Sequence, residues 1–149
     1  MYQNILVPID GSETAELGLR EAIGLARHLA SRIRLVHVIS ERPWLYSGTA
    51  PEVFEEILTH LRSSGETIIH EGKVAVRAAG VEVDHRLIEA PGDRAGEFIV
   101  SEAKDWPAQL IVCGTHGRRG LRRVLMGSDA EYVTSHSPVP VLLVRARAA

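Results

Sequence analysis

A segment rich in glycine and arginine follows an apolar stretch in the last third of the chain. Leu110 to Cys113 is apolar and β-branched, which is typical of a strand buried on both faces of a sheet. After the glycines and arginines the chain reaches Gly127-Ser128, a natural start for a helix. A strand, a glycine-rich loop and a helix N-terminus in this order often bind phosphate, because backbone N–H groups point at the anion. Phosphate binding is therefore the first chemistry that the sequence suggests.

The glycines of this segment are spaced as Gly114, two residues, Gly117, nine residues, and then Gly127 before Ser128. The plain alternative is that Gly114 and Gly117 only turn the chain after the strand, which is what glycine most often does. The buried strand before them, the hydroxyl residue at the helix start and the arginines between favour phosphate. The spacing matches neither the P-loop GxxxxGK[ST], which needs a lysine, nor the dinucleotide pattern GxGxxG.

Four arginines lie within six residues of this segment, with no acidic residue among them: Arg118, Arg119, Arg122 and Arg123. They are open to three interpretations. They form a solvated loop anchored by the apolar residues between them, one or two of them clamp a phosphate, or they belong to a nucleic-acid surface. The last is disfavoured, because the net charge is −2 and no other basic stretch or stacking aromatic extends the patch.

A second candidate lies near the amino end, where Asp10-Gly11-Ser12 follows the apolar stretch 3–9. Asp-Gly-Ser favours turns in any protein, so Asp10 has a plain role as a turn residue. Ser12 is a plausible N-cap for the helix that the next residues predict. The alternative role for Asp10 is ligand binding, because it stands at the end of a strand.

Strands and helices alternate along the whole chain, which predicts one α/β domain over residues 1–149 with an open parallel sheet and helices on both faces. Strands are expected at 3–9, 33–39, 81–87, 110–113 and 139–144. The first helix is expected to run from the Ser12 cap to about residue 31. Further helices are expected at 51–79, 95–106 and 128–136. The interior Gly65 and Gly72 fall on the apolar stripe of the long helix, which suggests close approach to the sheet. Asp10, Val38 and Gly114 come at strand ends, where ligands bind in such sheets.

Composition excludes several classes of protein. Cys113 is the only cysteine, so no internal disulfide is possible and a reducing cytoplasm is the expected location. No apolar run approaches the roughly 18 residues of a membrane span, so no membrane partner is expected. No paired carboxylates, metal cluster or Ser-His-Asp arrangement is evident, and no catalytic residue is assigned. His37 is interpreted as a hydrogen-bonded core residue, and Cys113 as a small buried hydrophobe.

Taken together, these motifs resemble one known family. Gly114-Thr115-His116-Gly117, the nine-residue spacer and Gly127-Ser128 resemble the ATP-binding signature of the universal stress proteins, and ILVPIDGSE, LVHV and SPVPVLLVR resemble the same family. The likeness covers essentially the whole chain. It implies a Rossmann-like domain, similar to the adenine nucleotide alpha hydrolases, with five parallel strands in the order 3-2-1-4-5. It also implies a homodimer formed through the last strand, Val139 to Val144.

The resemblance further implies a site for ATP or AMP, with Mg²⁺ at Asp10 as the possible metal. Backbone groups of Ile9 and Val38 would bracket the adenine, while Asp10 would approach the ribose or adenine side. Gly127 and Ser128 would bind the terminal phosphates. The full set of expected binding residues is Pro8, Ile9, Asp10, Val38, Gly114, Thr115, His116, Gly117, Arg118, Gly127, Ser128 and Asp129.

One residue departs from the family pattern. Where the family commonly has a small or apolar residue after the serine, this chain has Asp129. A carboxylate suits the positive end of a helix. If the side chain instead points into the loop, it repels phosphate or coordinates the metal.

Three functions remain open from the sequence. The leading one is a cytoplasmic stress-response homodimer that binds ATP or AMP as a ligand-controlled switch. The second is a dimeric interaction protein with a vestigial loop, in which Asp129 blocks phosphate. The third is an enzyme: the resemblance allows slow ATP hydrolysis or autophosphorylation, with Ser128 as the acceptor, and related folds transfer adenylyl or phosphoryl groups.

Overall fold

The computed structural model describes residues 1–41, 48–92, 94–115 and 126–146. Strands and helices alternate through these ranges, as the sequence predicts. The strands are β1 (Asn4–Pro8), β2 (Arg32–Ser40), β3 (Val83–Ala90), β4 (Leu110–Gly114) and β5 (Val141–Val144). The helices are α1 (Glu13–Leu29), α3 (Pro51–Ala78), α4 (Ala95–Asp105) and α5 (Ser128–His136).

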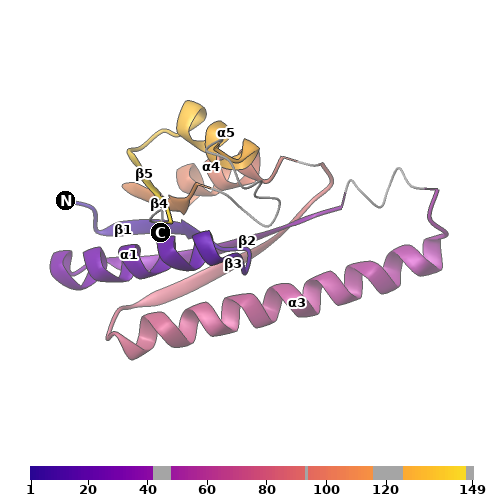
Figure 1. Cartoon of the computed structure of the whole chain (residues 1–149), viewed down its shortest axis with the longest axis horizontal. Helices are drawn as coiled ribbons and strands as arrows, with labels where there is room; N and C mark the ends of the chain where they lie inside the picture. Colours follow the sequence, from indigo (N-terminus) through magenta and orange to yellow (C-terminus); the bar gives the residue numbers. More distant parts are fainter. Residues whose placement is uncertain (42–47, 93, 116–125, 147–149) are drawn as a thin grey trace.

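All five strands are parallel and form one sheet in the order β3-β2-β1-β4-β5. The predicted fold and strand order are therefore confirmed. Helices α1 and α3 cover one face of the sheet, and α4 and α5 cover the other (Figure 1). Because every strand points the same way, every helix that follows a strand begins at the carboxyl edge of the sheet.

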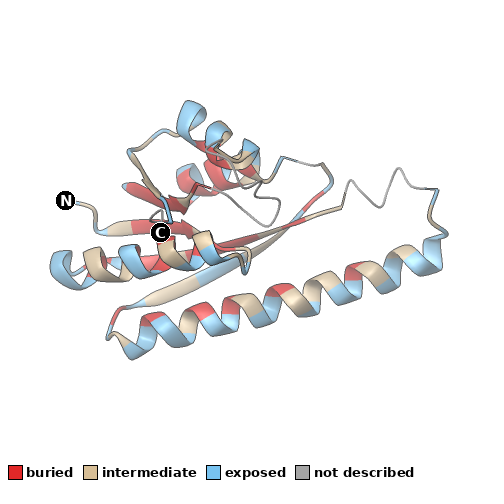
Figure 2. Cartoon of the chain, in the orientation of Figure 1, coloured by how far each residue is buried: buried red, intermediate tan, exposed pale blue. Residues whose placement is uncertain are grey.

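The core consists of two apolar layers, one on each face of the sheet. Alternate residues of a strand point to opposite faces, so Ile5 and Val7 pack under α1 and α3, whereas Leu6 packs under α4 and α5. The strands β1, β2 and β4 are buried along most of their length (Figure 2). This alternation explains why the central strands read as continuous apolar runs.

Helix α3 packs on the sheet through its glycines, as the position of Gly65 and Gly72 on the apolar stripe predicts. A Cβ on Gly65 would lie 2.8 Å from His37 Cδ2, and a Cβ on Gly72 would lie 2.9 Å from Leu35 Cδ1. The helix has 28 residues and is about 42 Å long, so its first turns extend beyond the sheet (Figure 1). None of the described helices is long and apolar enough to span a membrane.

Several boundaries differ from the sequence prediction. Strand β3, expected at 81–87, is Val83–Ala90. Helix α1 ends at Leu29 because Ala30 adopts a left-handed conformation, with φ of 53°. Strand β5 begins at Val141 rather than at 139, since Pro140 has no N–H for the ladder and contributes only its carbonyl oxygen, which accepts the N–H of Ile111 at 3.0 Å.

Helix α4 begins at Ala95, as the sequence predicts, and ends at Asp105. The N-cap is Arg94, which makes no side-chain capping bond. Asp93 lies outside the described residues.

Candidate functional site

The point where the strand order reverses lies between β1 and β4. These two strands are neighbours in the sheet, but the chain leaves β1 toward β2 and β3 on one side and leaves β4 toward β5 on the other. Open parallel sheets bind ligands beyond the carboxyl ends of the strands at such a point. Pro8 ends β1 and Gly114 ends β4, so the predicted glycine segment and the predicted Asp10 turn meet at one edge.

The turn after β1 joins the strand to α1 through two side chains. Asp10 Oδ1 accepts the N–H of Ser12 at 2.9 Å, and Gly11 adopts a positive φ of 79°. Ser12 Oγ then accepts the N–H of Ala15 at 3.2 Å, which confirms Ser12 as the N-cap of α1. Asp10 therefore acts as a turn residue, the plain role that the sequence suggests. Its half-buried carboxylate lies at the carboxyl edge of the sheet.

The backbone groups of Ile9, just after β1, are hydrogen-bonded to β2. The N–H of Ile9 donates to the Val36 carbonyl oxygen at 2.8 Å, and the Ile9 carbonyl oxygen accepts a bond from His37 Nδ1 at 2.8 Å. His37 is buried, so its interpretation as a hydrogen-bonded core residue is confirmed.

Val38 is the second residue whose backbone was expected to contact the base. Backbone groups of a strand alternate in direction, and Val36 bonds toward β1; the backbone of Val38 therefore faces the same side. The last residue pair between β1 and β2 is Pro8 with Val36, so Val38 lies beyond the end of β1.

Gly114 is a glycine because the first turn of α1 lies directly against it. A Cβ on Gly114 would lie 2.5 Å from the Thr14 carbonyl oxygen and 3.0 Å from the Ala15 nitrogen. Gly18 of α1 makes the reciprocal approach, with its Cβ position 3.2 Å from the Gly114 nitrogen. The glycine therefore has a packing role in addition to any part in a phosphate loop. Sequence reasoning missed Gly18, although a glycine on the apolar face of a helix was the available signal.

Thr115 and Gly127 bring together the two ends of the glycine segment. The Gly127 N–H donates to the Thr115 carbonyl oxygen at 2.7 Å, and the Thr115 N–H donates to the Val144 carbonyl oxygen at 3.0 Å. Thr115 is buried, so the hydrogen bond that joins the two ends of the segment is held against β4 and β5. His116, Gly117, Arg118 and the remaining arginines of the segment lie outside the described residues, and their expected roles stay predictions.

Helix α5 begins where the sequence places it, with Gly127 as N-cap and Ser128 as its first residue. Ser128 is exposed. The first N–H groups of a helix have no partner within the helix. The start of α5 thus presents donors and the positive end of the helix dipole at the same edge as Asp10.

Asp129 points toward a neighbouring helix. Its Oδ1 accepts the N–H of Gly96 in the first turn of α4 at 3.0 Å. The carboxylate therefore binds at a helix N-terminus, although the hydrogen bond goes to α4 and not to its own helix. This geometry ties α4 to α5.

Within the described ranges, no three histidine, cysteine, aspartate or glutamate side chains gather in a metal-binding group. Burial raises the pKa of the Cys113 thiol to about 11, so the thiol is protonated at neutral pH. Its interpretation as a small buried hydrophobe is confirmed.

The sequence resembles the universal stress protein family from residue 1 to residue 145. The universal stress protein MJ0531 of Methanocaldococcus jannaschii is 32% identical over 97% of this chain and 83% of its own length. Among solved structures, the hypothetical protein MJ0577 is 31% identical with a TM-score of 0.88, covering 100% of this chain and 99% of that one. A universal stress protein from Archaeoglobus fulgidus in complex with dAMP is 25% identical with a TM-score of 0.69, over 96% and 98% of the two chains.

Proposed function

This chain belongs to the universal stress protein family, and from that premise we propose that it binds ATP or AMP at the carboxyl edge of the β1–β4 junction. The observation that carries the proposal is the combination of a reversal in strand order with a helix N-terminus at the same edge. The relative from Archaeoglobus fulgidus that binds dAMP supports an adenine nucleotide as the ligand.

The base is proposed to lie against the backbone of Val38. An adenine offers a donor and an acceptor side by side along one edge, and a strand residue presents an N–H and a carbonyl on one side. Val38 faces past the end of β1, whereas the Ile9 N–H is already bonded to Val36. Of the two expected backbone contacts, Val38 is therefore the better supported.

The phosphates are proposed to run from Gly114 toward Ser128. Thr115 and Gly127 are bonded to each other, so a phosphate chain that follows the segment between them ends at the start of α5. The helix N-terminus and the Ser128 hydroxyl supply donors there. Mg²⁺ suits this arrangement, because it is commonly held by one or two carboxylates together with substrate phosphates. Asp10 is the carboxylate that would hold it, and the ion would neutralise phosphate charge.

The protein is proposed to act in the cytoplasm as a homodimeric switch. Nucleotide would order the glycine segment and so change how the protein binds its partners. The open edge of β5 is the proposed dimer surface, and its test is given in the Discussion.

The test is calorimetric titration of the purified protein with ATP and Mg²⁺. Binding with a Kd below 1 mM is expected. Ser128→Ala should weaken it by about tenfold, the loss of one good hydrogen bond. Gly117→Ala should also weaken it, because a Cβ restricts the backbone conformations of the phosphate loop. Ser135→Ala is the matched control, because Ser135 is an exposed serine in the last turn of the same helix. An absence of heat at millimolar nucleotide would overturn the proposal and leave the dimeric interaction protein. Phosphate release and the mass of the protein from the same samples report any hydrolysis or phosphorylation of Ser128.

A further inference from the structure

The first turns of α4 and α5 are in contact, and a carboxylate joins them. Asp129 Oδ1 accepts the Gly96 N–H at 3.0 Å. A Cβ on Gly96 would lie 3.0 Å from Tyr132 Cβ and 3.1 Å from the Asp129 carbonyl oxygen. The helices can approach this closely only because residue 96 is glycine, and the approach brings the two amino ends together.

The carboxylate lies at two positive helix ends. Asp129 is in the first turn of α5, and its hydrogen-bond donor is in the first turn of α4. No side chain of the N-cap residue Arg94 caps α4, so Asp129 supplies a side-chain acceptor from another element. Loss of the carboxylate would leave the buried Gly96 N–H without this acceptor.

The amino end of α5 is therefore held on two sides. Toward the sheet, the Gly127 N–H bonds to the Thr115 carbonyl oxygen at 2.7 Å. Toward α4, Asp129 bonds to Gly96, and the Arg94 guanidinium lies 5.9 Å from the centre of the Tyr132 ring. Ser128 stands between these two anchors in the sequence, and its position depends on both.

We propose that Asp129 is a positioning residue for phosphate. Its bond to Gly96 fixes the direction of the α5 N-terminus, so that Ser128 and the first N–H groups of the helix are aimed at the nucleotide phosphates. The inference rests on the proposed adenine nucleotide site. Asp129, which departs from the family pattern, thus supports phosphate binding and does not repel the phosphate. The same bond couples the start of α4 to the ligand.

The experiment compares ATP with adenosine, which has the base and ribose but no phosphate. Asp129→Ala should weaken ATP binding about tenfold, the effect of losing a good helix-terminus hydrogen bond, and change adenosine binding less than about twofold. Asp129→Asn keeps an oxygen acceptor without the charge, and ATP affinity should return to within about threefold of wild type. A general loss of structure would weaken both ligands together.

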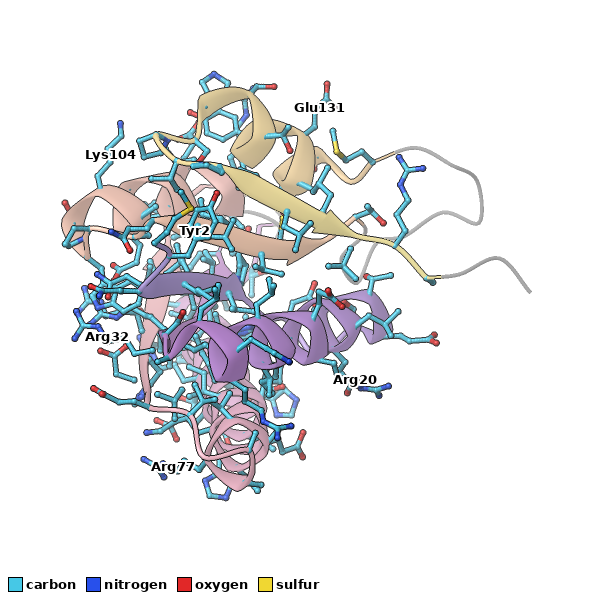
Figure 3. All side chains as sticks on the ribbon, turned by 90° about the vertical axis from the view of Figure 1, so that its left-hand side faces the viewer. Tyr2, Arg20, Arg32, Arg77, Lys104 and Glu131 are labelled. Carbon is cyan, nitrogen blue, oxygen red and sulfur yellow. The ribbon has the colours of Figure 1, made fainter. Side chains whose placement is uncertain are left out.

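Glu131→Gln is the matched control. It removes one negative charge from the same helix turn, and the Glu131 side chain points outward from α5 (Figure 3). The control should leave the ratio of ATP to adenosine affinity unchanged. An equal change of that ratio in Glu131→Gln and Asp129→Asn would show that charge alone acts, and would overturn the positioning role. Tighter ATP binding by Asp129→Ala would overturn it in favour of repulsion.

Amide hydrogen exchange separates failure of this inference from failure of the proposed function. If wild-type protein binds neither ATP nor adenosine, both the proposed function and the role toward phosphate are overturned. The hydrogen bond between Gly96 and Asp129 can still be tested, since Asp129→Ala should speed amide exchange at Gly96 at least tenfold and Glu131→Gln should not. If wild type and Asp129→Ala bind ATP equally well, only the inference is overturned. Should Asp129→Ala fail to fold, Asp129→Leu replaces it, because leucine has nearly the shape of aspartate and no acceptor, and it should weaken ATP binding by the same factor.

Discussion

At the scale of single residues, glycines decide how closely helices approach the strands that carry the site. Gly114→Ala would place a methyl group 2.5 Å from a backbone oxygen of Thr14, which cannot move aside like a flexible side chain. We expect this variant to lose about 1–3 kcal/mol of unfolding free energy, the usual cost of overpacking. Urea unfolding followed by circular dichroism measures it.

Gly24→Ala is the control for that variant. Gly24 lies inside α1, and its Cβ position has no atom within 4 Å. Alanine favours helix over glycine by up to about 1 kcal/mol, so this change should stabilise the protein. We therefore expect Gly114→Ala to lower the free energy of unfolding and Gly24→Ala to raise it. A neutral Gly114→Ala would show that α1 shifts freely over β4, and would contradict the close contact.

Several residue roles could be predicted because they depend on near neighbours in the sequence. Ser12 caps the helix that it precedes, and an N-cap is recognised from a few residues of local pattern. Asp129 was expected at a helix N-terminus and is found at one, but the hydrogen bond goes to α4. The donor, Gly96, lies 33 residues earlier in the chain, and no local pattern identifies which helix will lie alongside.

At the scale of elements, an ion-pair cluster joins α4 to strands β2 and β3. Arg34 of β2 donates to Asp84 of β3 at 2.7 Å and to Glu102 of α4 at 2.8 Å. The hydrogen bond to Asp84 contributes most to raising the pKa of Arg34, and the bond to Glu102 adds to it. The Arg34 guanidinium also lies 4.7 Å from the centre of the Trp106 ring, at the end of α4. The cluster therefore fixes α4 on the β3 side of the sheet.

Glu102→Ala tests this cluster. The Glu102 side chain is only 6% exposed and also approaches Arg86, so its removal leaves two arginines without a shared acceptor. We expect a loss of about 1.5–3 kcal/mol in unfolding free energy, the usual contribution of a hydrogen bond to a charged group, since Arg34 loses Glu102 but keeps Asp84. Glu16→Ala is the control: Glu16 pairs with Arg20 at 3.8 Å in a largely exposed position and should cost less than about 0.5 kcal/mol. Equal losses from the two variants would contradict the structural importance of the cluster.

The elements show which part of the fold a sequence can predict. Apolar periodicity places α3 and its glycines correctly, because the stripe that faces the sheet repeats every three or four residues. The partners of those glycines, His37 and Leu35, follow from the packing of α3 on β2 and are not visible in the helix itself. The start of β5 was misplaced by two residues because an apolar run with alternating prolines hides where ladder bonds begin.

At the scale of the whole molecule, the sheet has one edge whose side chains are apolar. Strand β5 is outermost, and each of its four residues is half-buried. The carbonyl oxygens of Pro140 and Val144 accept the N–H groups of Ile111 in β4 and of Thr115 directly after it, so residues 141 and 143 direct their backbone groups away from the sheet. An open edge of this kind pairs readily with another strand, and a second copy of the chain supplies an identical one. This is the structural basis for the proposed homodimer.

Leu143→Pro tests the dimer at the position where the backbone faces outward. Proline removes the outward N–H and leaves the β4 ladder with its partners, so the variant should remain folded and become monomeric. Leu143→Val keeps both the N–H and an apolar side chain, and it should remain dimeric. Size-exclusion chromatography with light scattering at micromolar concentration gives the mass of each variant, and circular dichroism confirms folding. A monomeric wild-type protein, or a folded Leu143→Pro that stays dimeric, would show that β5 does not form the interface. If nucleotide binding in the monomeric variant matches wild type, the site is complete within one chain, as the convergence of β1, β4 and α5 leads us to expect.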